Sequence, residues 1–291
     1  MNSTGVGSTG ENSTGAGGAG AGSTGADSTG ENAGVLYAVS DGIATITFNR
    51  PAVMNALDAD MIRGFCAAAG RAASDAAVRV VILRGAGPAF IAGGDVALFH
   101  DHRAALATLV PELAGELHQG ILALRRAPQP VIAAVHGAVA GAGMSIMLAC
   151  DLVIAAEDTQ FSLAYSRIGA SPDGGATWFL PRIVGYQKAM EIILLADTMD
   201  AASLQKIGIV NRVVAAEQLA AETDRLARRL AQGPARAYAE AKALVNRVAD
   251  AGLAAQLDAE ASAFARCAAT GDFAEGVAAF VAKRKPLFKG M

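Results

Sequence analysis

The sequence predicts an α/β fold in which strands alternate with helices first and helices alone fill the end of the chain. The apolar runs at 78–83 and 131–135 are rich in β-branched residues, as buried strands are. Each run is followed by a glycine-rich turn and then by a stretch with helical spacing. Because helices separate the strands, the strands should form a largely parallel sheet.

The first 34 residues are predicted to lie outside this fold. They contain five Ser-Thr-Gly triplets and 11 of the chain's 33 glycines, and Val6 is their one branched apolar residue. Such a segment buries too little apolar surface to offset the entropy lost on ordering, so we expect a flexible tail. It has neither the basic start and apolar core of a secretory signal nor the arginines of a mitochondrial presequence.

The expected elements of the first half follow in order along the chain. Residues 35–39 and 42–49 read as a hairpin with its turn at 40–42, and Asp58 is placed to cap a helix that runs to about residue 73. The strand at 78–83 precedes a helix over 103–126, which Pro111 is expected to kink or split.

The second half is expected to contain a few more short strands and then to end in helices alone. After the strand at 131–135 come a helix that includes 144–149 and short strands at 152–155 and 160–163. From Ala176 to Lys283 we expect helices almost throughout, too many to cover one sheet, so some should project and pack on a neighbouring subunit. The predicted division is a tail (1–34), a core (35–215) and a helical region (216–291).

Composition excludes several classes of partner. The net charge is −3, which does not favour nucleic acid or an anionic membrane, and no apolar run approaches the roughly 20 residues of a membrane span. The three cysteines are far apart in apolar surroundings and show no zinc-site spacing. We therefore expect a cytoplasmic protein with no metal, nucleic-acid or membrane partner.

The two glycine-rich turns, at 90–95 and 136–143, carry the functional signal. A turn of small residues before a helix leaves backbone N–H groups unpaired at the positive end of the helix dipole. Two such turns can direct two N–H groups at one oxygen, which is how enzymes stabilise an oxyanion.

The ordered motifs of residues 35–289 resemble the crotonase superfamily, the enoyl-CoA hydratase/isomerase family. The carriers, in family order, are Asn49-Arg50-Pro51, Asn55-Ala56-Leu57, 90–95, 136–143, Cys150-Asp151, 171–175, Leu180-Pro181-Arg182, Gly208-Ile209-Val210 and 280–285. The resemblance implies a spiral of β-β-α turns with a C-terminal helical trimerisation region. It also implies a homotrimer or hexamer and an acyl-CoA thioester substrate, with no separate cofactor.

The resemblance also assigns residues to the binding site. It implies that the backbone N–H groups of Gly94 and Ala142 form the oxyanion hole, and that Phe280 and Lys283 reach coenzyme A across a subunit boundary. The other substrate-binding positions that it implies are Ala56, Ala92, Gly93 and Gly141.

The catalytic groups implied by the resemblance favour isomerisation over hydration. The two glutamates of the family's hydratases match Ser145 and Tyr165, neither of which is a carboxylate. Asp173 matches a carboxylate that is the base of double-bond isomerisation in several relatives. Trp178 and Phe179 follow closely and are expected to form an apolar wall beside it.

Several alternatives stay open at this point. Asp173 precedes a helix, so it is also a good N-cap. A hydratase with a different acid/base pair and a non-catalytic acyl-CoA-binding protein both fit the sequence. A serine hydrolase using Ser145 is disfavoured because the Gly-x-Ser-x-Gly motif is absent.

Overall fold

The computed structural model describes residues 34–290, so the predicted tail lies almost wholly outside the described residues. The strands are β1 (Val35–Ser40), β2 (Ile43–Phe48), β3 (Val80–Gly85), β4 (Val131–Val135), β5 (Ala138–Ala140), β6 (Leu152–Ala156), β7 (Gln160–Ser162), β8 (Met199–Asp200) and β9 (Arg212–Val214). The α-helices are α1 (Ala59–Ser74), α2 (Val96–Asp101), α3 (Leu106–Arg126), α4 (Ala142–Leu148), α5 (Ala176–Val184), α6 (Tyr186–Leu195), α7 (Ala201–Lys206), α8 (Leu219–Ala231), α9 (Ala235–Arg247), α10 (Leu253–Ala268) and α11 (Gly271–Val281). Short 3₁₀ helices lie at η1 (Pro51–Val53), η2 (Arg103–Ala105), η3 (Ala164–Ile168), η4 (Ala216–Gln218) and η5 (Val248–Asp250).

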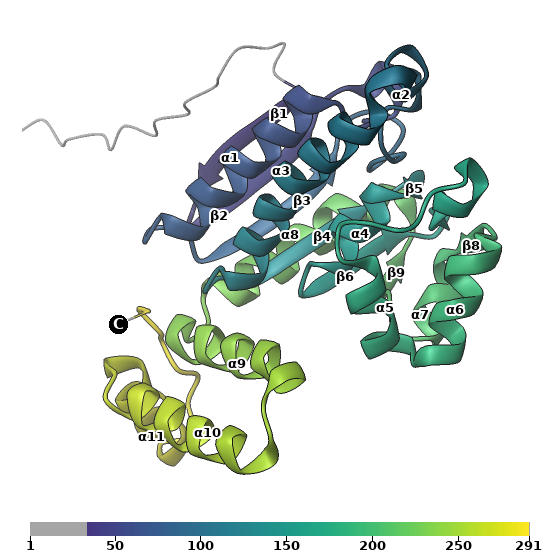
Figure 1. The fold of residues 1–291 in the computed structure, drawn as a ribbon. Coiled ribbons are helices and arrows are strands. Elements are labelled where there is room, and N and C mark those ends of the chain that lie inside the picture. Colours follow the sequence, from purple (N-terminus) through teal and green to yellow (C-terminus); the bar gives the residue numbers. More distant parts are fainter. Residues whose placement is uncertain (1–33, 291) are drawn as a thin grey trace, which may run out of the picture.

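Within the described residues the main sheet has the order β1-β2-β3-β4-β6-β9, and a small sheet has the order β5-β7-β8. The β1–β2 hairpin is antiparallel and every later pair of the main sheet is parallel, as the alternation of strands and helices predicts. Helices α1 and α3 lie side by side over one face, and α8 lies against the other (Figure 1). The small sheet continues from the end of β4, which places the second glycine-rich turn at the edge of the main core.

Local sequence explains the helix that leads to the first turn. The Asp58 side chain accepts a hydrogen bond from the Met61 N–H at 2.9 Å, so it caps α1 as expected. The buried face of α1 includes Phe65, whose ring lies 5.6 Å from that of Phe48. Phe90, at the start of the first glycine-rich turn, packs edge-on against Phe48. The turn is therefore anchored in the main hydrophobic core.

The structure corrects three of the expected elements. Pro111 lies inside α3 without splitting it, and the expected helix over 103–126 begins instead with η2. A short helix, α2, lies between the first turn and that longer helix, where no separate element was predicted. The region after Ala176 also contains β8 and β9, and β9 pairs parallel with β6 at the edge of the main sheet. At two and three residues these strands are too short to show a period-two pattern.

The last three helices project from the core. Figure 1 shows α9, α10 and α11 as a group below the sheet, away from α2, and Lys242 joins α9 to the core through the carbonyls of Leu124 and Gln129. Helix α8 packs against β3, β4 and β6 and so covers the sheet instead of joining this group. Among residues 34–290, no helix is long and apolar enough to cross a membrane.

Candidate active site

The two glycine-rich turns lie directly against each other. Ile91 and Val139 form a parallel bridge, and the Ala140 N–H donates to the Ile91 carbonyl at 2.9 Å. Gly93 has a φ of 111° and Gly141 a φ of 49°. A Cβ built on Gly141 would lie 3.5 Å from the Cα of Gly93, an ordinary contact distance, so space alone does not require glycine there. Glycine is favoured at both positions because it adopts these positive φ values without strain.

Each turn presents a backbone N–H with no acceptor among the described residues. Leu57 forms a parallel bridge with Gly94. The Leu57 N–H donates to the Gly93 carbonyl, and the Asp95 N–H donates to the Leu57 carbonyl. Neither hydrogen bond uses the Gly94 N–H. The Ala142 N–H is the first of α4, so no helical carbonyl precedes it. These are the two donors that the resemblance implies, and they follow the adjacent glycines 93 and 141.

The Asn55 side chain anchors the first glycine-rich turn through hydrogen bonds. Its side chain is fully buried, and its Nδ2 donates to the carbonyls of Ala86 at 2.9 Å and Ala89 at 2.8 Å. Its Oδ1 accepts from the Arg50 N–H at 2.7 Å. The arginine side chain also donates to the Ala56 carbonyl at 2.7 Å and lies 3.4 Å from Asp95. This network ties the segment before α1 to the turn that carries Gly94.

Asp173, Tyr165 and Ser145 come together beside α4. The Tyr165 hydroxyl donates a short hydrogen bond to Oδ1 of Asp173. The Ser145 hydroxyl lies 2.9 Å from the Asp173 carbonyl oxygen and 3.2 Å from the Tyr165 oxygen. Ser145 is fully buried and lies one helical turn after Ala142. One short helix thus presents the unpaired Ala142 N–H at its start and, through Ser145, contacts Asp173 one turn later.

Tyr165 is held in its neutral form. Burial raises its pKa, and the negative charge of Asp173 and the hydrogen bond to it raise the pKa further. A phenol in this setting is a hydrogen-bond donor and not a base. The family resemblance marked position 165 only as lacking the hydratase glutamate. No local sequence signal indicates that Tyr165 contacts Asp173, eight positions later.

Asp173 is not the side-chain N-cap of α5. The N-cap of that helix is Gly175, with no side-chain hydrogen bond, and Asp173 contributes only its carbonyl, which accepts from Ala176 N–H at 3.2 Å. The carboxylate turns to Tyr165 instead.

Trp178 is 37% exposed and stacks against Arg182, so it does not form the expected apolar wall, whereas Phe179 is buried. A Cβ built on Gly174 would lie 3.3 Å from Cδ1 of Ile121, which brings that α3 side chain to the site.

The structure does not bring every predicted residue to this place. Ala56 and Ala92 lie at the first turn, where the Ala92 N–H donates to the Met54 carbonyl at 3.0 Å. Phe280 is 84% exposed on α11, and Lys283 lies just beyond that helix, in the projecting group of Figure 1. Within one chain these last two residues are remote from the oxyanion turns.

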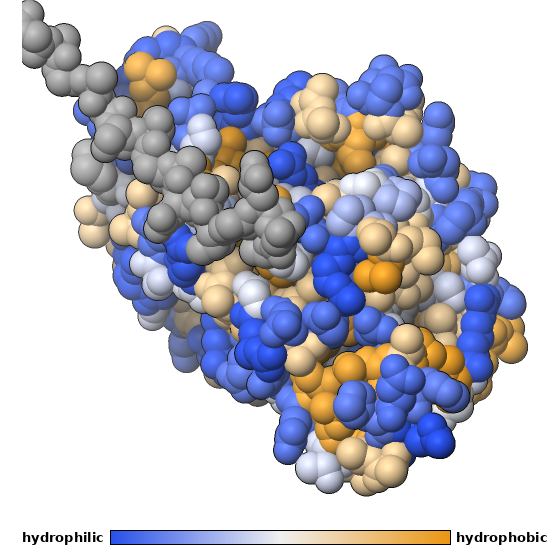
Figure 2. All heavy atoms as spheres, turned by 90° about the horizontal axis from the view of Figure 1, so that it is seen from above, coloured by the Kyte–Doolittle hydropathy of each residue, from blue (hydrophilic) through white to orange (hydrophobic). Residues whose placement is uncertain are grey.

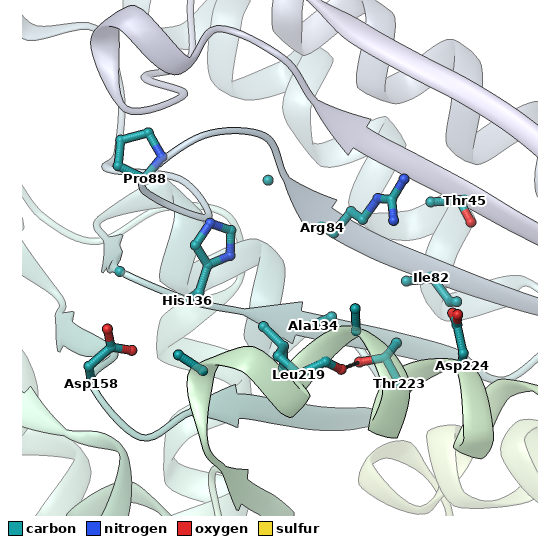
Figure 3. A pocket seen from close by; sticks show the side chains of 14 residues that line it. Thr45, Ile82, Arg84, Pro88, Ala134, His136, Asp158, Leu219, Thr223 and Asp224 are labelled. Atoms are coloured by element: carbon teal, nitrogen blue, oxygen red, sulfur yellow. Dashed lines mark hydrogen bonds between the residues drawn. The ribbon is translucent and has the colours of Figure 1, made fainter.

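A separate hollow of about 490 Å³ lies on the α8 side of the main sheet. Figure 3 shows Arg84 and His136 on one side of it and Leu219, Thr223 and Asp224 of α8 on the other. The His136 Nε2 lies 2.8 Å from the Gly87 carbonyl, which links the second glycine-rich turn to the end of the segment after β3. None of the residues that line this hollow belongs to the predicted site.

Across residues 34–290, no group of histidine, cysteine and acidic side chains could hold a metal ion.

The α/β fold and the two contacting glycine-rich turns, with their unpaired N–H donors among the described residues, define the class of structure to compare with known proteins. The family model for enoyl-CoA hydratase/isomerase matches residues 38–291. A Rhodobacter capsulatus protein named "Probable enoyl-CoA hydratase" is 40% identical over 256 residues, which cover 88% of this chain and 98% of that protein. The Escherichia coli 1,2-epoxyphenylacetyl-CoA isomerase is 35% identical over 260 residues, with the same coverage of both chains.

Solved structures give the same result. A crystal structure of an enoyl-CoA hydratase from Polaromonas sp. JS666 superposes with a TM-score of 0.84 at 33% identity, covering 88% of this chain and 99% of that one. The chain belongs to the enoyl-CoA hydratase/isomerase family, the crotonase superfamily. The predicted family and the crotonase-like α/β fold with a C-terminal helical region are therefore confirmed.

Proposed function

We propose that this protein is an enoyl-CoA isomerase in which Asp173 moves a proton and the Gly94 and Ala142 N–H groups hold the enolate oxygen. One observation carries the proposal: a carboxylate is present at Asp173, where it accepts a hydrogen bond from Tyr165, whereas the positions of the two hydratase glutamates hold neutral hydroxyls. A single carboxylate suffices for isomerisation because the same group removes and returns the proton.

The reaction that fits is the shift of a 3-enoyl thioester to its conjugated 2-enoyl isomer. The Asp173 carboxylate takes a proton from the carbon next to the thioester carbonyl, and the electron pair spreads into a dienolate. The dienolate oxygen accepts hydrogen bonds from the Gly94 and Ala142 N–H groups, each worth on the order of 100- to 1000-fold in rate. The protonated Asp173 then gives its proton to the carbon at the far end of the dienolate, which completes the shift without another reactant.

Hydration is the second candidate, since relatives of this chain carry hydratase as well as isomerase names. Hydration needs one group to activate water and another to protonate the carbon beside the carbonyl. Tyr165 is a neutral donor and Ser145 is fully buried with its hydroxyl on the Asp173 carbonyl, so neither is placed as a base for water. The structure supports one base, and isomerisation is the reaction that one base can complete.

Two substrates and one variant test the proposal. A 3-enoyl-CoA should gain the absorbance of a conjugated thioester, and crotonyl-CoA should keep it. Asp173→Asn should slow the first reaction by about 100- to 10,000-fold and leave a measurable residual rate. Loss of the crotonyl-CoA absorbance would identify a hydratase, and full turnover by the Asp173→Asn variant would exclude Asp173 as the base. Binding of acyl-CoA with no turnover of either substrate would identify a non-catalytic family member, and labelling of Ser145 by a fluorophosphonate would favour a hydrolase.

We further propose a homotrimer or hexamer in which α11 of one chain completes the coenzyme A site of another. Large apolar side chains of α9–α11 are solvent-exposed in the single chain, such as Leu253 at 75% and Phe280 at 84%. Figure 2 shows further hydrophobic surface, collected toward the lower edge of the face seen from above. Exposed apolar surface of this kind marks protein contacts. Phe280 and Lys283 would then contact the coenzyme A that lies along Ala56 and Ala92 of the neighbour.

The remaining expectations concern location and cofactors. Coenzyme A enters as part of the substrate, and we propose no separate cofactor. The cytoplasmic location and the division of the chain at residue 216 stay predictions.

A further inference from the structure

We propose that Tyr165 is a positioning residue: its hydroxyl holds Oδ1 of Asp173 so that Oδ2 is the oxygen that carries the substrate proton. This inference rests on the proposed isomerase function and adds a residue to it. The family resemblance treats position 165 only as a place where a hydratase carboxylate is missing.

The proton inventory of the site assigns the donors. An ionised carboxylate only accepts hydrogen bonds, so the short Tyr165–Asp173 contact has the phenol as its donor. The Ser145 hydroxyl has one proton and lies nearest the Asp173 carbonyl oxygen, at 2.9 Å, compared with 3.5 Å to the Gly141 carbonyl. Tyr165 thus holds the side chain of Asp173, while Ser145 holds its main chain. Among the described residues, Oδ2 of Asp173 has no hydrogen-bond partner.

The local backbone explains why Asp173 needs this support. Gly174 and Gly175 follow it with φ values of 59° and 82°, and no regular element begins until α5. Conformational freedom of glycine on one side leaves the carboxylate dependent on contacts from other elements. Those contacts come from α4 and η3, which are separate in sequence from Asp173 and from each other.

Tyr165 itself is rigidly mounted. Its carbonyl accepts from the Ala170 N–H at 3.0 Å, and the neighbouring Arg167 donates to the Ala196 carbonyl at 2.6 Å, which ties η3 to the end of α6. Burial and the adjacent carboxylate keep the phenol neutral, so it stays a donor while Asp173 takes up and releases a proton. The hydrogen bond is stronger to the ionised carboxylate than to the acid, which favours return of the proton to the substrate.

The test compares Tyr165→Phe, Asp173→Asn and the double variant in steady-state isomerisation of a 3-enoyl-CoA. Tyr165→Phe should lower kcat about 10- to 100-fold, the usual effect of a hydrogen bond to a charged group, with KM changed less than about twofold. The effect should disappear in the Asp173→Asn background, because Tyr165 acts through that carboxylate. Tyr37→Phe is the matched control, since the Tyr37 hydroxyl on β1 is also buried but has no hydrogen-bond partner among residues 34–290. Thermal melting of each variant separates a loss of fold from a loss of position.

Each other outcome overturns a defined part of the argument. If Asp173→Asn is strongly slowed but Tyr165→Phe keeps its kcat, the positioning role is wrong and the proposed function stands. If KM rises and kcat does not change, Tyr165 binds substrate instead. If the double variant is slower than Asp173→Asn by the full single-variant factor, Tyr165 acts independently of Asp173. If Asp173→Asn keeps full activity, the proposed function fails first.

Discussion

Substituting Gly143 by alanine should separate the two oxyanion turns. A Cβ at this position would lie 2.4 Å from the Ile91 carbonyl oxygen and 2.6 Å from the Ile91 Cβ. Non-bonded heavy atoms prefer about 3.5 Å, so the turns must move apart by about 1 Å. The Gly143 backbone is helical, and alanine is the better helix former by about 1 kcal/mol, so the clash alone opposes the substitution. Overpacking of this kind costs about 1–3 kcal/mol of stability.

A displacement of about 1 Å in an oxyanion donor should lower kcat about 100-fold. The assay is the isomerisation rate at saturating 3-enoyl-CoA, measured well below the melting temperature, with urea unfolding as the stability readout. Gly115→Ala is the matched control, because Gly115 lies in α3 and its added Cβ would meet no atom within 4 Å. A Gly143→Ala enzyme with unchanged kcat, or an equal loss in Gly115→Ala, would refute the reasoning.

Three further predictions concern the parts that support the site. Asn55→Ala should lower the free energy of unfolding in urea by about 3 kcal/mol, because it leaves several buried carbonyls without a donor; a loss below about 1 kcal/mol would contradict this. Lys242→Met should cost about 2–3 kcal/mol and loosen α9 in limited proteolysis, because the buried lysine pairs with Asp151 at 2.7 Å and donates to the Leu124 and Gln129 carbonyls. Resistance of α9 to cleavage in this variant would argue against it. Hydrogen bonds from Arg284 and the Leu287 N–H lower the pKa of Glu275 from its ordinary 4.5 to about 2. Their contribution is present above about pH 4.5 and is lost as the pH falls toward 2. The protection of the amides after α11, measured as the intrinsic exchange rate at each pH divided by the observed rate, should therefore fall in that window, and Glu275→Gln should remove this pH-dependent fall.

Much of the fold followed from the sequence because its signals are local. Asp58 caps α1 through the next turn of the same helix, and the buried run 131–135 is a strand with the bounds that were predicted. The strands β5, β8 and β9 were missed because two or three residues carry no periodic signal, and their pairing comes from partners elsewhere in the chain.

The candidate site shows the same contrast between local signals, which the sequence reveals, and long-range contacts, which it does not. The assignment of Gly94 and Ala142 stays a prediction, based on the visible pattern of glycine-rich turns after strands, and both N–H groups lack an acceptor among the described residues. The role of Asn55 depends on the carbonyls of residues 86 and 89, about thirty positions away, and no spacing rule reveals it. The N-cap alternative for Asp173 was wrong because a tertiary partner, Tyr165, competes with the helix for the carboxylate.

The identities at 145, 165 and 173 form one consistent set. Ser145 is fully buried and lies within hydrogen-bond distance of both Tyr165 and the main chain of Asp173. Carboxylates at all three positions would place like charges in a small buried volume, where each opposes ionisation of the others. Two neutral hydroxyls beside one carboxylate avoid this repulsion and leave that carboxylate both oriented and available. The chemistry proposed for this chain therefore depends on which of the three positions carries the charge, while the paired N–H donors of the two turns suit either reaction of the family.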